Sequence, residues 1–269
     1  MDPWQVSGHV LTDIEPRDLC MTHSLKRTLV SPNIHIGPGD SPERMKYDGD
    51  YGDHDKLVTF DIETTHYDPD KGETVAIGVG HHEVGSPGSE AKYETFARRQ
   101  RGVDDERQLV ERAFKFIDRL DGDTLVSYNG VGFDMDFLYK RSARFDPAPG
   151  SPILHREGHH VDLFADRKAA CGPNDKWPSL EECLESYDLP VPETIWNGAP
   201  IDNTRFGEEF APAFLDALAT GDEQEISRYR GALDHYLKTD LEANVALYYA
   251  DQGLAFDPVH LDLRGEFQT

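Results

Sequence analysis

Apolar residues follow two patterns along this chain, and the two patterns predict different elements. Short apolar runs bounded by polar or turn-forming residues indicate strands, whereas apolar positions that recur every three or four residues indicate helices with one buried face. Strands are expected at residues 57–63, 74–79, 93–96, 124–128 and about 160–164. Helices are expected at about 104–120, from about 133, from 179 and, longest of all, from about 222 to 250.

The order of these elements favours an α/β fold. Three strands come first and are followed by alternating helices and strands, an order that predicts a mixed sheet covered by helices around one core. Asp104 or Asp105 is expected to cap the first helix. We expect this domain at residues 57–251, an N-terminal extension and loop region at residues 1–56, and a C-terminal tail at residues 252–269.

The protein is strongly acidic. Its 269 residues include 51 Asp and Glu but only 27 Lys and Arg, which gives a formal net charge of −24. The acid is spread along the chain, a composition typical of proteins from a salt-loaded, halophilic cytoplasm, where salt screens the repulsion. Aromatic residues make up 10% of the chain, which excludes a disordered protein.

No pattern in the sequence indicates a membrane, secretion or zinc. The longest strictly apolar run, residues 245–250, is far shorter than the roughly 20 residues that cross a bilayer. The first residues lack the features of a signal peptide, and the three cysteines form no close pair. The histidine pairs at 81–82 and 159–160 show no ligand spacing and are expected in solvated loops. We therefore expect a cytoplasmic protein with no membrane contact.

Two carboxylates share one face of the first strand. Successive strand side chains point to opposite faces, so Asp61 and Glu63 share one face while Phe60 and Ile62 share the other. Neighbouring carboxylates within an apolar strand repel each other and lose hydration, and the strand offers no lysine or arginine as a partner. A hard divalent cation is the expected partner.

A third carboxylate lies at the start of a helix. If this helix begins near Phe133, Phe137 and Leu138 lie three and four residues after Asp134 and share its face, so Asp134 is expected to face the core. Asp136 lies roughly 200° away and is expected in solvent. An interaction of Asp134 with the helix dipole is the alternative explanation.

The fourth carboxylate belongs to the last helix. Asp240 and Asn244 fall within its apolar stripe, whereas Glu242 falls off it. Tyr236 lies one turn before Asp240 on the same face, and His235 points roughly 140° away if the helix is continuous. Four acidic side chains without basic partners suit two hard cations about 3.5 to 4 Å apart, an arrangement that cleaves phosphodiesters.

Three segments resemble, in order, the motifs of the DEDD superfamily of 3′–5′ exonucleases. Residues 60–65 are similar to the first motif, and residues 128–138 resemble the second as it occurs in the proofreading domains of family B DNA polymerases. Residues 236–240 resemble the third motif of the tyrosine-bearing (DEDDy) branch. Since no polymerase fits in the remaining residues, we expect a stand-alone member.

The resemblance implies a ribonuclease H-like fold, with a central mixed five-stranded sheet flanked by helices. It implies two divalent cations, Mg²⁺ or Mn²⁺, one held by Asp61, Glu63 and Asp240 and the other by Asp61 and Asp134. These ions would activate water and neutralise the leaving 3′ oxygen, so that nucleoside 5′-monophosphates are released. Tyr236 would orient the water.

By the same analogy Thr64, Asn129 and Phe133 contact the terminal nucleotide, although Asn129 could equally cap the turn. The third motif also fits the spacing of a branch that uses histidine, which leaves His235 as the alternative to Tyr236. That branch places its histidine in a loop before the helix. Residues 222–250 read as helix throughout, so Tyr236 is favoured.

The expected partner is nucleic acid, as a single-stranded 3′ end of DNA or RNA. In molar salt, counterion release contributes little to binding, which favours a short footprint held by stacking, hydrogen bonds and metals. Arg141 and Arg144 follow the second motif and would either meet phosphate or lie on a solvated face. Three alternatives stay open: a ribonuclease H-like module that binds nucleic acid or protein without cutting, an endonuclease on the same fold, and an acidic cation-binding protein.

Overall fold

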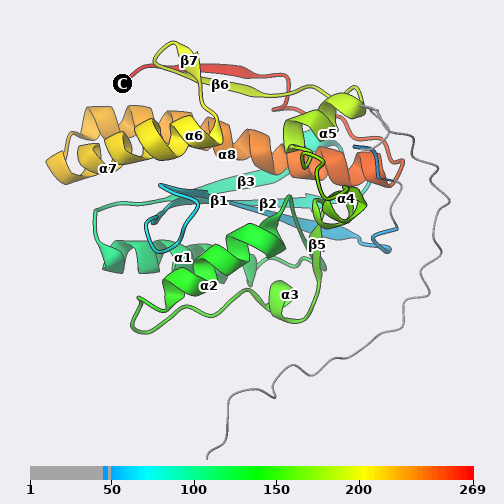
Figure 1. Ribbon diagram of the computed structural model, residues 1–269, viewed down its shortest axis with the longest axis horizontal. Helices are drawn as coiled ribbons and strands as arrows, with labels where there is room; N and C mark the ends of the chain where they lie inside the picture. Colours follow the sequence, from blue (N-terminus) through cyan, green and yellow to red (C-terminus); the bar gives the residue numbers. More distant parts are fainter. Residues whose placement is uncertain (1–44, 48–49) are drawn as a thin grey trace, which may run out of the picture. The chain divides into compact units, whose positions relative to one another are not determined.

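Five strands form the central sheet, in the order β3-β2-β1-β4-β5 (Figure 1). The computed structural model describes residues 45–47 and 50–269, so most of the expected N-terminal extension lies outside the described residues. The strands are β1 (Lys56–Thr64), β2 (Thr74–Glu83), β3 (Lys92–Ala97), β4 (Thr124–Ser127) and β5 (His160–Asp162). Because β1 pairs antiparallel with β2 and parallel with β4, the sheet is mixed, as predicted.

Helices cover both faces of this sheet. The predicted long helix is confirmed as α8 (Glu223–Asp251), which packs on one face (Figure 1). Helices α1 (Val103–Ile117) and α2 (Met135–Ser142) pack on the other face. The alternation of β1 divides its side chains between the two cores: Phe60 and Ile62 join α1 and α2, whereas Leu57 joins α8. Asp61 and Glu63 lie on the same face of β1 as Leu57, and they therefore face α8.

Shorter elements connect these parts. A short helix begins after Ser179, as expected, and Ser179 and Glu182 form a reciprocal capping box there. The remaining elements are η2 (Gly88–Glu90), the π-helical turn η3 (Gly130–Asp134), α3 (Ile153–Arg156), α4 (Ala165–Ala170), α5 (Leu180–Ser186), α6 (Asn203–Arg205), the π-helical turn η4 (Phe206–Phe210) and α7 (Ala211–Thr220).

A second, smaller sheet includes residues of the expected C-terminal tail. Strand β8 (Arg264–Phe267) pairs in parallel with β6 (Glu193–Trp196), which also pairs with β7 (Ala199–Pro200). These strands lie against α8 (Figure 1). Each has at most four residues, too few for alternation to stand out in the sequence.

The first helix does not start as predicted. Its N-cap is Gly102, and neither Asp104 nor Asp105 occupies that position. Asp105 is instead buried and accepts hydrogen bonds from the Arg98 side chain and the Arg99 main chain, at 3.0 and 2.9 Å. A buried guanidinium attracts the carboxylate more strongly than the helix terminus does.

Two further expectations about polar residues are wrong. His82 is not in a solvated loop: it is buried on β2, and its Nε2 is hydrogen-bonded to the Tyr249 hydroxyl at 2.9 Å. His160 lies on β5, where its Nε2 is hydrogen-bonded to Ser127 Oγ at 2.7 Å.

Glu242, expected off the buried stripe of the long helix, is fully buried. It accepts hydrogen bonds from the backbone N–H groups of Val259, His260 and Leu261. The chain that follows α8 folds back over this face of the helix, so α8 is buried on more than one side. Within the described part of the chain, no helix combines the length and apolarity needed to cross a membrane.

Candidate active site

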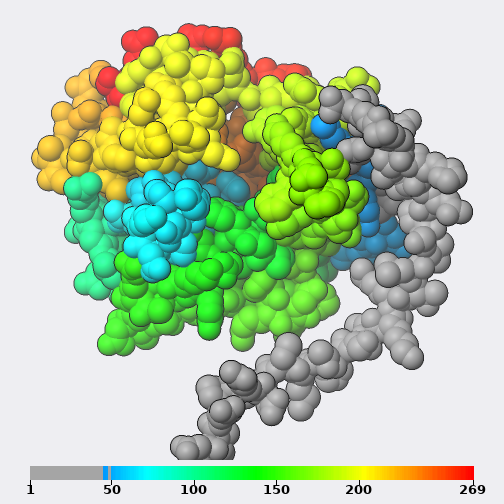
Figure 2. Space-filling model, in the orientation of Figure 1, coloured from blue at the N-terminus to red at the C-terminus, as the bar shows by residue number. Residues whose placement is uncertain are grey.

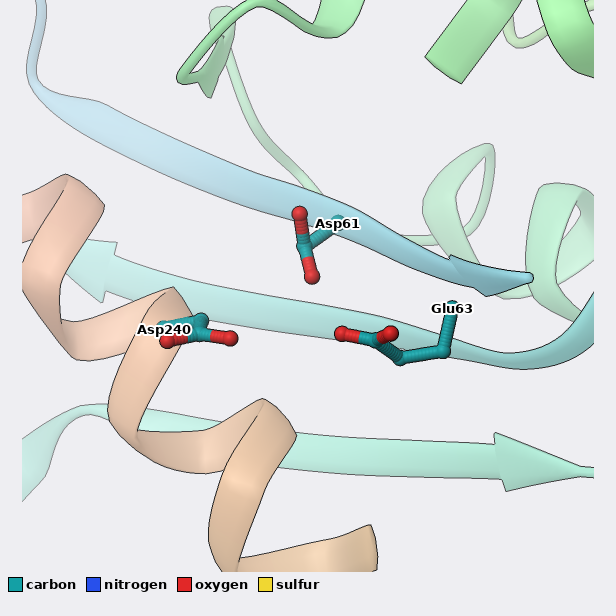
Figure 3. A group of neighbouring side chains, drawn as sticks. All are labelled: Asp61, Glu63 and Asp240. Atoms are coloured by element: carbon teal, nitrogen blue, oxygen red, sulfur yellow. The ribbon is translucent and has the colours of Figure 1, made fainter. Parts of the chain in front are cut away.

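The carboxylates of β1 meet a carboxylate of α8. One oxygen from each of Asp61, Glu63 and Asp240 lies within 4.8 Å of the other two. Figure 3 shows the three side chains pointing toward one another, two from the strand and one from the helix. The sequence predicted this convergence of two distant segments, and the structure brings them together.

A glycine on the neighbouring strand allows this approach. Gly78 of β2 is the register partner of Asp61 and therefore lies on the same face of the sheet. A Cβ atom at Gly78 would lie 3.0 Å from Leu241 and 3.2 Å from Leu237, two core residues of α8. Without a side chain at this position, α8 lies close enough to the sheet to place Asp240 beside Asp61.

The clustered carboxylates are difficult to ionise together. Burial raises the pKa of Asp61 to about 7. Burial also raises the pKa of Glu63, and the charges of Asp61, Asp240 and Asp134 raise it further. For Asp240 the pKa rises through burial and the charges of Asp61 and Glu181. Ionising all of them would concentrate negative charge that no lysine or arginine among the described lining residues offsets.

A fourth carboxylate, that of Asp134, comes from the turn that follows β4. Asp134 ends η3, is only 4% exposed as predicted, and its Oδ2 is buried without a hydrogen-bond partner in the described part of the chain. Burial and the charges of Asp61 and Asp162 raise its pKa. Asp136 is exposed, also as predicted, and it pairs with Lys140. Asp134 is not one of the three residues within 4.8 Å of one another, but its charge raises the pKa of Glu63.

An acid that the sequence reasoning missed holds the turn that carries Asp134. Asp162, at the end of β5, accepts hydrogen bonds from the backbone N–H groups of Asn129 and Val131, at 2.8 and 3.1 Å. Asn129 adopts the left-handed conformation, with φ 64°. At Gly130 a Cβ would lie 2.1 Å from Ser127 Oγ, so only glycine fits beside this strand. The signal available was an acid at the end of a strand parallel to β4.

Tyr236 and His235, the two residues proposed from the third motif, point to different parts of the structure. Tyr236 donates a hydrogen bond from its hydroxyl to Asn203 Oδ1 at 3.2 Å and stacks on Phe206. His235 is hydrogen-bonded through Nδ1 to Thr194 Oγ1 at 2.8 Å, under the small sheet. Since α8 is continuous through both residues, they lie on different sides of it, as predicted.

One cavity of about 500 Å³ is lined by eight of the residues proposed from the sequence. Figure 2 shows the hollow, between the β1–β2 loop in cyan, the α6 region in yellow and the α4–α5 region in yellow-green. The predicted residues that line it are Asp61, Glu63, Thr64, Asn129, Phe133, Asp134, Tyr236 and Asp240. His235 does not line it.

The cavity also contains aromatic residues that the sequence did not reveal. Trp177 is 54% exposed, packs edge-on against Phe164 and has Lys168 Nζ 4.2 Å from its ring centre. On another part of the lining, the rings of His66 and Tyr67 stack with centroids 4.4 Å apart. They lie in loops without periodicity, so nothing in their spacing linked them to the carboxylates.

The arginines expected near the second motif do not reach the cavity. Arg141 is buried in an ion pair with Glu106, and Arg144 pairs with Asp70. Arg141 thus neither meets phosphate nor lies on a solvated face, because Glu106 satisfies its charge inside the protein. Among the described residues, no lysine or arginine lines the cavity.

The donor set fits hard divalent cations. The converging groups are carboxylate oxygens, which such cations prefer, and they have no basic partner in the cavity. The unpaired Asp134 Oδ2 and the unpaired, buried Asn244 Oδ1, both in residues that line the same cavity, are further oxygens of this kind. Asp61, Glu63 and Asp240 could hold one cation, and Asp61 with Asp134 a second.

Several known proteins are similar to this chain. A DNA polymerase of Thermococcus aggregans is 30% identical over 134 residues, and one of Pyrococcus glycovorans is 32% identical over 96 residues. These matches cover 40% and 33% of this chain but only 7% and 12% of the polymerases. The chain therefore spans a small part of the length of the curated relatives it matches.

Structures of exonuclease I are also similar. The complex of the E. coli enzyme with a 5cy-dT13 oligonucleotide has a TM-score of 0.34 at 12% identity, covering 70% of this chain and 43% of that one. The apo exonuclease I structure has a TM-score of 0.35 at 10% identity, covering 73% and 47%.

The family follows from a match to the sequence itself. The profile of the RNase H superfamily matches residues 58–195, just over half of the chain, from the first strand to the small sheet. The central sheet within this span is mixed, five-stranded and flanked by helices, as the resemblance implied. The protein therefore belongs to the RNase H superfamily.

Proposed function

We propose that this protein is a metal-dependent 3′–5′ exonuclease that hydrolyses the terminal phosphodiester bond of single-stranded nucleic acid. The observation that carries the proposal is the convergence of Asp61, Glu63 and Asp240 within 4.8 Å, in one cavity with Asp134 and without a basic residue. The 3′–5′ direction rests on the resemblance of the three motif segments.

The proposed reaction is the hydrolysis of a phosphodiester bond. A water oxygen adds to phosphorus, the bond between phosphorus and the 3′ oxygen breaks, and the leaving oxygen ends with a proton. The products are a nucleoside 5′-monophosphate and a strand one nucleotide shorter. When bound, two divalent cations lower the pKa of water and offset the negative charge of the phosphodiester.

Tyr236 is suited to orient the water rather than to deprotonate it. Burial and the charges of Glu63, Asp240 and Asp61 raise its pKa well above the ordinary value of a tyrosine. The hydroxyl therefore keeps its proton at neutral pH and acts as a hydrogen-bond donor and acceptor. Its bond to Asn203 holds the ring in the cavity.

The cavity lining supports a single-stranded end as substrate. Phe133 and the exposed Trp177 offer ring surfaces on which bases can stack, and stacking tolerates any base sequence. A protein of net charge −24 has little long-range attraction for a phosphate backbone. Thr64 and Asn129 are suited to hydrogen-bond the terminal nucleotide.

The test is degradation of 5′-labelled single-stranded DNA and RNA with Mg²⁺ or Mn²⁺ in molar potassium chloride. We expect a ladder that shortens from the 3′ end, that disappears with EDTA, and that is abolished by Asp61→Ala. A strand blocked at its 3′ end should stay intact. Cleavage of a circular substrate would instead indicate an endonuclease, and binding without any product would indicate a non-cutting module.

A further inference from the structure

A second cavity opens at the free edge of the central sheet. Its volume is about 760 Å³, and it is bounded by the edge strand β3, by α1 and by the first half of α8. It shares no lining residue with the carboxylate cavity. Three arginines line it, Arg99, Arg112 and Arg230, each from a different segment of a strongly acidic protein.

Arg99 and Arg230 are exposed in the cavity wall, and Arg112 is partly buried. Buried arginines elsewhere in the described chain are held by carboxylates, as Arg98 is by Glu73 and Arg167 is by Asp251. Within the same described residues, no ion pair joins a carboxylate to any of the three cavity arginines.

Two acids also line the cavity, fewer than the three arginines. Asp234 pairs with Lys238 at 2.7 Å, and Glu94 on β3 is exposed and forms no ion pair among the described residues. Burial and the charge of Arg99 lower the pKa of Arg112, and Asp105 only partly opposes this. The cavity is therefore a locally positive site.

Polar atoms around the cavity also lack partners. Arg112 donates one hydrogen bond, from Nη2 to the carbonyl oxygen of Ala97 at 3.0 Å. Its Nε and Nη1 atoms are buried and have no partner among the described residues, and the same holds for the hydroxyl of Thr95. Buried donors are normally paired, so a group with acceptor oxygens would satisfy these atoms.

We propose that this cavity binds a phosphate group, carried by a free nucleotide or by a nucleic-acid strand. A guanidinium donates charge-assisted hydrogen bonds to phosphate oxygens, and Arg112 has N–H groups at Nε and Nη1 that no described residue accepts. Arg99 and Arg230 supply the additional charge that suits a phosphate better than a singly charged carboxylate. The volume lies within the range of small-ligand pockets.

The test is calorimetric titration of the full chain in EDTA, at a salt concentration where circular dichroism shows it folded. EDTA keeps the carboxylate cavity free of divalent cations, so that it repels phosphate. The probes are inorganic phosphate, adenosine 5′-monophosphate, adenosine and an oligonucleotide with a blocked 3′ end. We expect binding of the phosphate-bearing probes and none of adenosine. Tighter binding of the mononucleotide or of the oligonucleotide identifies the source of the phosphate.

Variants locate the site. Arg112→Gln should weaken binding by about tenfold or more, since charge-assisted hydrogen bonds to the phosphate are lost. Arg119→Gln, an exposed arginine just beyond α1 that does not line the cavity, is the matched control and should leave binding unchanged. If Arg112→Gln unfolds the protein, the exposed Arg230→Gln replaces it. Absence of binding by the wild type, or equal binding by the cavity variants and the control, overturns the proposal. Because no metal or cleavage enters the measurement, its outcome is independent of the nuclease proposal.

Discussion

Two aspartates only two residues apart, Asp134 and Asp136, lie in opposite environments. Asp134 is buried with an unpaired oxygen, while Asp136, two residues later, is exposed and paired with Lys140. The helical period turns one toward the core and the other toward solvent. Because both residues are aspartates, the same substitution at each position compares a buried carboxylate with an exposed one.

We predict that Asp134→Asn reduces the rate of nucleotide release by more than about 100-fold, the upper end of what losing a partner of a metal ligand costs. The amide carries no charge to hold a cation. Asp136→Asn should retain nearly full activity because its carboxylate lies in solvent. The measurement is the initial rate of 5′-monophosphate release at saturating Mn²⁺. Equal rates for the two variants would contradict the assignment of Asp134.

Tyr236 and His235 permit a second test at single positions. Tyr236→Phe removes only the hydroxyl that orients water and is expected to lower kcat by about 10- to 100-fold with little change in KM. His235→Ala is expected to keep its turnover, since His235 is bonded to Thr194 outside the cavity. A dead His235→Ala together with a fully active Tyr236→Phe would show that the histidine serves the reaction.

At the scale of elements, the distance between α8 and the sheet decides whether the cluster exists. We predict that Gly78→Ala destabilises the protein by about 1–3 kcal/mol, because its Cβ would overpack against Leu241 and Leu237. The displacement would also move Asp240 away from Asp61 and lower activity. Gly150→Ala, with no atom within 4 Å of the added Cβ, is the control. Urea unfolding midpoints measure the loss, and an unchanged midpoint for Gly78→Ala would be evidence against close packing here.

The loop between α4 and α5 supplies an aromatic surface without touching the carboxylates. Trp177→Ala is expected to raise KM for a single strand by about 5- to 100-fold, the loss of one stacked base, and to leave kcat nearly unchanged. The control is Tyr139→Ala, an exposed aromatic on α2 outside the cavity. Steady-state kinetics on oligonucleotides decide the matter: a fall in kcat at constant KM would assign Trp177 to the chemistry instead of to strand binding.

At the scale of the whole molecule, the cavity carboxylates make the stability of the folded protein depend on pH and on metal binding. Their pKa values in the folded chain are raised, that of Asp61 to about 7, so the folded state binds more protons than the unfolded one. Without metal, this contribution to stability is therefore lost as pH rises from about 4 through about 7. The partly buried His160, with a pKa lowered to about 3, acts in the opposite direction. Below about pH 6.5 the unfolded chain binds a proton at this histidine while the folded chain does not, so this contribution to stability is lost as pH falls from about 6.5 to about 3.

We accordingly predict that Mn²⁺ raises the melting temperature more at pH 8 than at pH 5, relative to EDTA. The cation neutralises ionised carboxylates at pH 8, whereas at pH 5 it must first displace protons. Comparing Mn²⁺ with EDTA at each pH removes the contribution of His160. Asp61→Asn should abolish most of the difference. A metal effect that is the same at both pH values, or that survives in this variant, would speak against a cation at the cluster.

Much of the central architecture could be predicted because its signals are local. The strands of the central sheet, the long helix and the inward faces of Asp134 and Asp240 follow from alternation and helical spacing. The small sheet, the burial of Glu242 and the pairing of Arg141 with Glu106 could not, because each depends on a partner far away in the chain. The expectation of a salt-loaded cytoplasm stays a prediction.

The sequence by itself determined which faces of its strands and helices would be apolar and which acids would interrupt them, since backbone periodicity alone sets those directions. Only the tertiary structure decided which acids meet and which are neutralised. Asp240 approaches Asp61 because Gly78 lets the helix lie close to the sheet, and Arg112 is left unpaired at the edge while Arg141 finds Glu106. Charge compensation depends on distances in space, and those distances are set by packing between segments that are remote in the chain.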